Sequence, residues 1–316
     1  MSRETILISC IQLQRTINAH RPRLEANGLE LVLPDVRGQQ LSEDEMLELV
    51  PGVAGIIAGD DVISRAVLER ADALRVVSKW GVGIDNIDLA AATEAGVRVT
   101  NTPGAFGDEV ADVVIGYLVL IARGLHLVDR GVRAGEWPKP EGVSLAGRTI
   151  GIIGLGDIGR EVARRCLAMR MRALGVDPSQ SAAIAAAAEG VEVVAMRALL
   201  NRADVVSLHC PLNTATHHLL DAHAFASMPR GAWLINTARG GVVDEPALVN
   251  ALAEGQIGAA ALDVFADEPL PEWSQLRSFE NVILGSHNSS NTAEAVHRTS
   301  VQAIDNLLDG LAGGAR

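Results

Sequence analysis

Aromatic residues are scarce in this chain of 316 residues: they make up 3% of it, as four Trp, four Phe and one Tyr. Proteins that bind single-stranded nucleic acid without sequence preference stack bases on aromatic side chains, so the low content argues against that class. Basic residues are also in deficit, with 27 Lys and Arg against 39 Asp and Glu and a net charge of −12. A surface that tracks nucleic-acid phosphates is therefore not expected.

Long hydrophobic runs and cysteines are few as well. The longest apolar run, 113–122, is far shorter than the about 20 residues that a membrane-spanning helix needs. The start, MSRETILISC, has no long apolar stretch before a small-residue cleavage site, so we expect neither a membrane anchor nor a secretory signal. Cys10, Cys166 and Cys210 are widely spaced in apolar surroundings, which predicts reduced core thiols, a cytoplasmic location and no metal site.

Glycine accounts for 31 of the 316 residues, which exceeds its usual share of ~7%. Hydrophobic residues make up 48% of the chain. The length suggests about two domains. Short apolar runs alternate with helical patterns throughout, which predicts parallel sheets with helices on both faces. We expect strands in a first series at 5–10, 29–33, 55–58, 75–78 and 97–100, and in a second at 149–154, 172–177, 204–208, 232–236, 259–264 and 282–285.

Two long helices are predicted beside these strands. Apolar residues at one helical face indicate a helix over 108–126 that buries this face against something large. A last helix, 293–308, follows after the second sheet is complete and is expected to return to the first. The chain thus reads as an α/β protein of two doubly wound parallel-sheet domains, one formed by 1–101 plus 289–316 and the other by 102–288.

A glycine motif follows strand 149–154 and opens a helix: Gly154-Leu155-Gly156-Asp157-Ile158-Gly159. The next strand ends at Asp177, as in a dinucleotide-binding βαβ unit. The glycines allow a tight turn, close approach to a pyrophosphate and close helix packing. A carboxylate at 177 would accept hydrogen bonds from the ribose hydroxyls of NAD. It would repel the 2′-phosphate of NADP, so NAD is favoured over NADP. The alternative is a glycine-rich turn that binds nothing.

Three further segments end predicted strands with polar residues, at 235–244, 262–269 and 284–292. They contribute one arginine, one glutamate and one histidine, namely Arg239, Glu268 and His287. Ligands of open parallel sheets bind at the carboxyl ends of the strands, so we expect these three side chains at the same edge.

At these residues the chain resembles the D-isomer-specific 2-hydroxyacid dehydrogenase family, in particular its phosphoglycerate dehydrogenase-like members. The resemblance covers nearly the full length and rests on 81–88, 101–104, the glycine motif, 209–212, 236–240, 263–269 and His287. It implies a flavodoxin-like substrate domain, a Rossmann NAD-binding domain and a homodimer. The helix from Asp108 onward is the candidate dimer interface, although burial against its own domain would explain the same apolar stripe.

The resemblance also implies roles for individual residues. His287 matches the acid/base, Glu268 the carboxylate that orients its ring, and Arg239 the cation that holds the substrate carboxylate. NAD contacts are implied for the glycine motif, Asp177, His209, Cys210, Pro211, Thr237, Ala238, Arg239, Asp263, His287 and Ser290. For Cys210, simple core packing is an equal alternative to a place near the adenine.

On the substrate side, Gly81-Val82-Gly83 matches a loop whose backbone N–H groups receive the substrate carboxylate. Lys79 and Trp80 precede this loop and are also candidate substrate residues. Lys79 is expected either to meet a substrate phosphate or to be a solvated surface lysine. Together with Arg239 and His287, these residues form the predicted substrate site.

The chain departs from the family pattern around the histidine and near 106–112. Ser286 precedes His287 where the family often has Pro, and a polar Asn288-Ser-Ser-Asn291 follows. Substrate identity and reaction direction are therefore open. The choices are an enzyme acting on 3-phosphoglycerate, an enzyme acting on a relative such as hydroxypyruvate or glyoxylate, and an NAD(H)-sensing, corepressor-like protein. The complete Arg, Glu and His set favours an enzyme. Because the sequence ends at 316, we expect no regulatory domain after the core.

Overall fold

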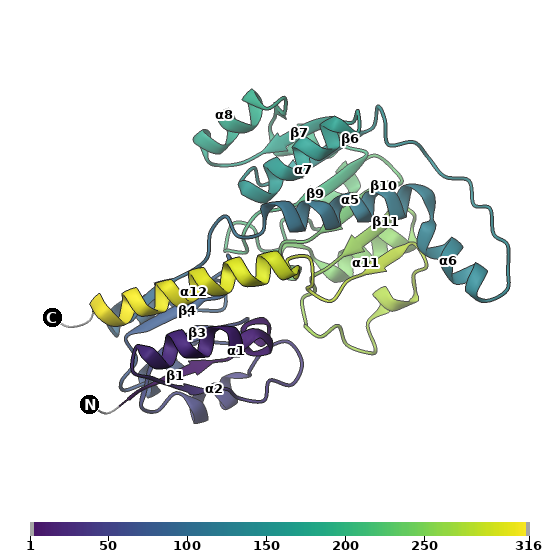
Figure 1. Ribbon diagram of the computed structural model, residues 1–316. Helices are drawn as coiled ribbons and strands as arrows, with labels where there is room; N and C mark the ends of the chain where they lie inside the picture. The colour runs from purple at the N-terminus through teal and green to yellow at the C-terminus, as the bar shows by residue number, and fades with distance from the viewer. Residues whose placement is uncertain (1–2, 314–316) are drawn as a thin grey trace. The chain divides into compact units, whose positions relative to one another are not determined.

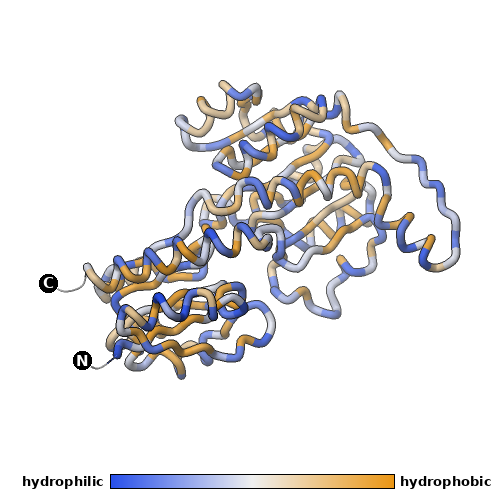
Figure 2. The backbone as a smooth tube through the Cα atoms, viewed as in Figure 1, coloured by the Kyte–Doolittle hydropathy of each residue, from blue (hydrophilic) through white to orange (hydrophobic). Residues whose placement is uncertain are grey.

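The computed structural model describes residues 3–313 and divides the chain into two compact units (Figure 1). Unit 1 comprises Met1–Ala105 with Asn291–Arg316, and unit 2 comprises Phe106–Ser290. The sequence predicts domain boundaries between residues 101 and 102 and between residues 288 and 289. Figure 2 shows hydrophobic residues concentrated along the strands of both sheets.

Unit 1 contains a sheet of five parallel strands in the order β2-β1-β3-β4-β5. This is the flavodoxin-like order that the family resemblance implied. The central strands are buried on both faces because helices cover them, so their sequences are continuous apolar runs. The strands are β1 (Glu4–Ile8), β2 (Leu29–Val32), β3 (Val53–Ala58), β4 (Val76–Lys79) and β5 (Arg98–Thr100).

The last helix of the chain, α12 (Ala293–Gly313), packs on β3 and β4 of this sheet, as its position in the sequence predicted. It buries Ala303, Ile304 and Leu307 on the face toward the strands. The other helices of unit 1 are α1 (Ile11–Ala26), α2 (Glu43–Leu49), α3 (Arg65–Arg70) and α4 (Leu89–Glu94).

Unit 2 contains a sheet of seven parallel strands in the order β12-β11-β10-β9-β6-β7-β8. The first six strands in chain order, β6 to β11, follow the Rossmann order, and β12 extends the sheet beyond β11. The sequence missed β8 because that strand is only two residues long. The strands are β6 (Thr149–Ile153), β7 (Arg172–Val176), β8 (Glu192–Val193), β9 (Val205–Leu208), β10 (Ala232–Asn236), β11 (Ile257–Leu262) and β12 (Val282–Leu284).

Six neighbouring strands of this sheet end in register. Their last residues, Val176, Ile153, Leu208, Asn236, Leu262 and Leu284, pair in a row across the sheet. The residues that directly follow them are Asp177, Gly154, His209, Thr237, Asp263 and Gly285, which we call the edge row. Parallel pairing thus brings predicted NAD-binding residues from separate segments to one edge.

The helix predicted over 108–126 is two helices in the structure. The first, α5 (Gly107–Arg123), ends because Gly124 adopts the left-handed conformation, and α6 (Leu125–Arg133) begins there. Within residues 3–313 no single helix is long and apolar enough to cross a membrane. In that described part of the chain, only α5 and α6 together would reach the required length and composition, and they are bent by 69°.

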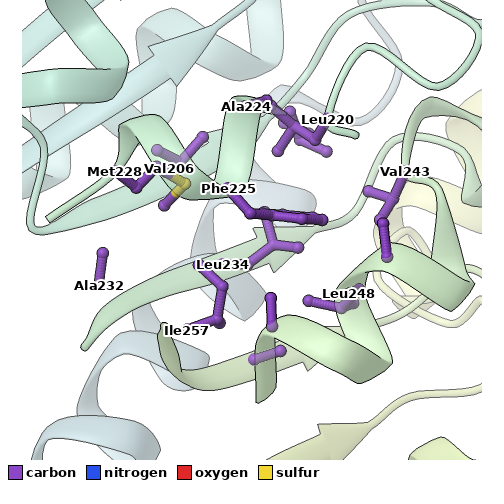
Figure 3. Close-up of a cluster of buried hydrophobic side chains, with 14 of the residues drawn as sticks. Val206, Leu220, Ala224, Phe225, Met228, Ala232, Leu234, Val243, Leu248 and Ile257 are labelled. Atoms are coloured by element: carbon purple, nitrogen blue, oxygen red, sulfur yellow. The ribbon is translucent and has the colours of Figure 1, made fainter. Parts of the chain in front are cut away.

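Two hydrophobic clusters flank the unit 2 sheet. In one, Phe225 packs with Val206 and Leu234 of the sheet and Leu248 of helix α11 (Glu245–Ala253) (Figure 3). In the other, the apolar face of α5 packs against the sheet and helix α7 (Asp157–Ala168). The remaining helices of unit 2 are α8 (Gln180–Ala188), α9 (Met196–Arg202) and α10 (Ala222–Ser227), with 3-10 turns η1 (Gly240–Val242) and η2 (Gln275–Ser278).

Candidate active site

The glycine motif forms the turn from β6 into α7. Gly154 has φ +96°, and a Cβ there would lie 2.6 Å from the backbone of His209, so a side chain is excluded. Gly156 is the N-cap of α7, and nothing lies within 4 Å of the position that its Cβ would occupy. The first N–H groups of a helix form an anion site when nothing covers them. The turn therefore fits the pyrophosphate of a dinucleotide.

Asp177 lies beside this turn at the end of β7. Its Oδ2 accepts a hydrogen bond from Leu155 N at 2.7 Å, and its Oδ1 accepts one from Ser179 N at 2.7 Å. These two bonds fix the carboxylate, while each oxygen retains capacity for a second donor. A fixed, half-buried carboxylate next to the glycine turn fits the ribose hydroxyls of NAD.

Two more residues of the edge row have polar atoms suited to a bound group. Within the described chain, the hydroxyl of Thr237 is buried without a hydrogen-bond partner, and so is Nδ1 of His209. The other His209 nitrogen, Nε2, is 2.8 Å from Ser207 Oγ. Burial lowers the pKa of His209 to about 3, so the ring is neutral. A buried hydroxyl without a partner is costly, which fits an additional hydrogen-bonding group at Thr237.

Cys210 follows His209 and is half-buried, and its side chain packs against the core cluster of Phe225. Burial raises the pKa of this thiol to about 11, so it is not a nucleophile at neutral pH. Pro211 is exposed, and its carbonyl accepts a hydrogen bond from Thr216 Oγ1. Core packing thus accounts for Cys210, while a place for it near the adenine stays a prediction.

His287 and Glu268 form a hydrogen-bonded pair within unit 2. His287 Nδ1 is 2.7 Å from Glu268 Oε2, and the side chains are 23% and 17% exposed. The second oxygen of Glu268 accepts a hydrogen bond from Phe265 N at 2.9 Å. Glu268 is therefore held by its own loop, and it orients the ring so that Nε2 is the nitrogen that can meet a substrate. A carboxylate partner also favours the protonated imidazole.

Arg239 directly precedes η1 at the end of the β10 segment. Asn236, which is buried, fixes this segment: its Oδ1 accepts from Ala238 N at 3.0 Å and its Nδ2 donates to Arg239 O at 2.9 Å. Arg239 Nη1 donates to Ala238 O at 2.9 Å. Since β10, β11 and β12 are neighbours, the segments that carry Arg239, Glu268 and His287 all leave the same edge of the sheet.

Two residues of the predicted substrate site in unit 1 form hydrogen bonds within the protein. Gly81 N donates to Thr102 Oγ1 at 3.0 Å, so within the described chain the donors left for a carboxylate are those of Val82 and Gly83. Trp80 is buried, and its indole N–H donates to Ser300 Oγ of α12 at 3.0 Å. Trp80 therefore supports the loop through that contact.

Lys79 is neither a solvated surface lysine nor an unpaired cation. The residue is 2% exposed, and its Nζ donates to Gly59 O at 2.6 Å and to Asp60 Oδ1 at 2.7 Å. Asp60 therefore offsets much of the charge that could have met a substrate phosphate.

Sequence patterns carried no signal for two residues that contact Asp263, namely Tyr117 and Ser289. Both act through tertiary contacts that no spacing rule reveals. Ser290, which was predicted to bind NAD, is half-buried at the end of unit 2. Among residues 3–313, no group of three or more His, Cys, Asp or Glu could hold a metal ion.

Comparison with known proteins agrees with this geometry. The model of the D-isomer specific 2-hydroxyacid dehydrogenase, NAD binding domain, matches residues 115–289, which is more than half of the chain. The chain belongs to the D-isomer-specific 2-hydroxyacid dehydrogenase family. It is accordingly an NAD-dependent oxidoreductase of D-2-hydroxy acids. The part of the chain that matches the NAD-binding domain lies wholly in unit 2.

Three curated relatives are similar over most of the chain. A glyoxylate reductase of Thermofilum pendens is 40% identical over 80% of this chain and 76% of its own length. A hydroxypyruvate reductase of Thermotoga maritima is 34% identical over 87% of this chain and 90% of its own length. A D-3-phosphoglycerate dehydrogenase of Methanocaldococcus jannaschii is 39% identical over 81% of this chain but only 49% of its own length.

Among solved structures, the TT0316 protein of Thermus thermophilus is 35% identical, covers 98% of this chain and 97% of its own, and has a TM-score of 0.83. This dehydrogenase therefore shares its fold with that structure over nearly the entire chain.

The preference for NAD should depend on Asp177. We expect Asp177→Ala to lower the ratio of kcat/KM with NADH to that with NADPH by about tenfold or more, because it removes a carboxylate that repels the 2′-phosphate. Steady-state kinetics with both cofactors measures the ratio. Asp204→Ala is the control, since Asp204 also accepts from a backbone amide but at the amino end of the sheet. An unchanged ratio in Asp177→Ala would refute the ribose role.

Proposed function

We propose that this dehydrogenase reduces small unphosphorylated 2-keto acids of the glyoxylate and hydroxypyruvate class with NADH. The observation that carries the proposal is the ion pair of the buried Lys79 with the half-buried Asp60, which lies beside the predicted carboxylate loop. A paired lysine attracts a substrate phosphate less than a free one, and the Asp60 carboxylate would repel it. The names of the relatives from Thermofilum and Thermotoga support the same substrate class.

Oxidation of 3-phosphoglycerate is the second candidate. The 39% identity to the Methanocaldococcus phosphoglycerate dehydrogenase favours it. The chain spans about half of that relative, so activity toward this substrate does not transfer directly. The two candidates differ in one substrate group, the distal phosphate.

In the proposed reduction, bound NADH supplies the hydride to C2 of the keto acid. His287 Nε2, protonated, donates its proton to the carbonyl oxygen as the hydroxyl forms, and Glu268 stabilises the charged ring before that transfer. Arg239 holds the substrate carboxylate and polarises the carbonyl with its planar cation. In the reverse reaction, neutral His287 accepts the hydroxyl proton.

The phosphate preference can be measured with NADH and a panel of glyoxylate, hydroxypyruvate and 3-phosphohydroxypyruvate. We expect kcat/KM to be higher for the unphosphorylated acids. Asp60→Asn should shift the preference toward 3-phosphohydroxypyruvate by about tenfold, because it leaves the lysine charge unbalanced. Lys79→Met is the paired control and should not produce that shift.

A preference of the wild type for 3-phosphohydroxypyruvate would contradict the proposed substrate class and favour the second candidate. Binding of NADH without turnover of any acid in the panel would contradict an enzyme and favour an NAD(H) sensor.

The acid/base role predicts a specific loss in one variant. His287→Ala should lower kcat by about 10²–10⁴ while the dissociation constant of NADH changes little, because only the proton transfer is removed. Stopped-flow absorbance of NADH and fluorescence titration measure the two quantities. His223→Ala, on α10, is the matched control and should retain wild-type kcat. Wild-type turnover in His287→Ala would reject the assignment.

We also propose a homodimer that uses α6 and the segment that follows it. The α5 stripe packs within unit 2, so it no longer requires a partner. Four large hydrophobic residues nearby are exposed instead: Leu125, Val132, Trp137 and Val143. Apolar side chains gathered on one exposed segment favour an interface.

Sedimentation velocity tests this surface. We expect the wild type to sediment as a dimer and Trp137→Asp to shift it toward monomer, because a charge would be buried at the interface. Trp273→Asp is the matched control, since Trp273 is equally exposed (79% against 78%) but lies outside the segment. A wild-type protein that sediments as a monomer would contradict the proposed homodimer.

A cytoplasmic location is proposed from the three thiols. All three cysteines are free, and burial raises the pKa of both Cys10 and Cys166 to about 12. Such thiols remain reduced, as in cytoplasmic proteins. Recovery of the native protein in a secreted or periplasmic fraction would contradict this location.

A further inference from the structure

His287 lies on a short turn that leaves β12 and has an uncommon backbone conformation. Its φ is +52°, in the left-handed region that non-glycine residues seldom adopt. A residue is kept in that region only when its surroundings fix it. The contacts that fix this turn therefore decide where the imidazole points.

Asp263, at the end of β11, holds three consecutive residues of the turn. Its carbonyl accepts from His287 N at 2.7 Å. Its carboxylate accepts from Asn288 N at 3.2 Å and from Ser289 N at 2.8 Å. The Ser289 hydroxyl also donates to this carboxylate. Asp263 is 2% exposed, so water does not replace these bonds if they break.

Tyr117 of α5 lies close to Asp263. Its hydroxyl faces the negative charge of the Asp263 side chain, and the residue is 9% exposed. Gly285 allows the two to approach the turn closely: a Cβ there would lie 2.1 Å from Asp263 Oδ1 and 2.6 Å from Tyr117 Oη. Tyr117 is the only tyrosine in the chain.

We propose that Tyr117 is a positioning residue for the acid/base: its hydroxyl fixes the Asp263 carboxylate, which in turn fixes the 287–289 backbone and the direction of the imidazole. The inference rests on the proposed role of His287. It adds a residue from α5, 170 positions earlier in the chain, to a site otherwise formed at the carboxyl ends of strands.

The protonation of Tyr117 supports this assignment. Burial, together with the negative charge of Asp263, raises the pKa of the phenol well above its ordinary value. The hydroxyl therefore stays protonated across the working pH range and is able to donate to the carboxylate. Phenylalanine would fill the same volume without a group that can donate.

The test compares Tyr117→Phe with Val114→Ala in the full-length protein. Val114 is a buried apolar residue of the same helix and the same cluster, one turn earlier, and has no polar side-chain atom. The Val114→Ala variant therefore shows the effect of general loosening of α5. Three quantities are measured: kcat and KM with NADH and glyoxylate, the pH dependence of kcat, and amide hydrogen exchange of the peptide that covers 285–290.

For Tyr117→Phe we expect kcat to fall about tenfold with both KM values within about twofold, as for loss of one hydrogen bond to a charged group. The pH at which the reductive rate is half-maximal should move lower, since a loosened turn weakens the contact of His287 with Glu268, and reduction needs the protonated ring. Exchange at 285–290 should become faster. Val114→Ala should lower Tm without a change in the pH profile or in this exchange.

Wild-type kcat, pH profile and exchange in Tyr117→Phe would overturn the proposal, as would changes equal to those of Val114→Ala. Amide exchange does not depend on turnover, so it tests the positioning role of Tyr117 separately from the proposed function. If the wild type turned over no keto acid, the proposed function would fail, while exchange would still report whether Tyr117 holds the turn.

Discussion

The register of the parallel strands in unit 2 is the constraint on which the site depends. Six strands end in one row, so the residue after each strand is delivered to the same edge without any long loop to fold. The edge row supplies the first glycine of the glycine turn, the Asp177 carboxylate that is bonded to that turn, and the anchor of the histidine turn. A shift of one residue in any pair would turn these side chains to the opposite face.

Carboxylates fix loops in both units by accepting hydrogen bonds from backbone N–H groups. Asp61, fully buried after β3, accepts from Leu41 N at 2.8 Å and Gly59 N at 2.9 Å. Asp263 does the same for the histidine turn, and Asp177 for the glycine turn. Charged acceptors form stronger hydrogen bonds to backbone N–H groups than neutral ones, which suits loops that must hold a fixed shape. Part of the acidic excess of the sequence is therefore structural.

The sequence predicted what depends on local pattern and on strand order. The alternation of strands and helices predicted both parallel sheets, the spacing of the glycine motif predicted the glycine turn, and the completed second sheet predicted the return of the last helix. The pairing of Glu268 with His287 follows from family resemblance. What it could not predict depends on contacts between distant segments. Nothing near Lys79 in the sequence marks Asp60 as its partner rather than a phosphate, because the pairing needs β3 and β4 side by side. The break at Gly124 was missed because the apolar pattern continues through it.

The scarcity of aromatics now has a structural meaning. The indole N–H of the buried Trp80 donates to Ser300 Oγ, and the hydroxyl of the buried Tyr117 lies near the Asp263 carboxylate. A buried hydroxyl costs free energy unless it is hydrogen-bonded, and cores of Ala, Val and Leu avoid that cost. A chain that fills its cores with aliphatic residues and retains one tyrosine has its hydroxyl near a buried carboxylate. That is the physical reason to assign Tyr117 to the histidine turn rather than to packing alone.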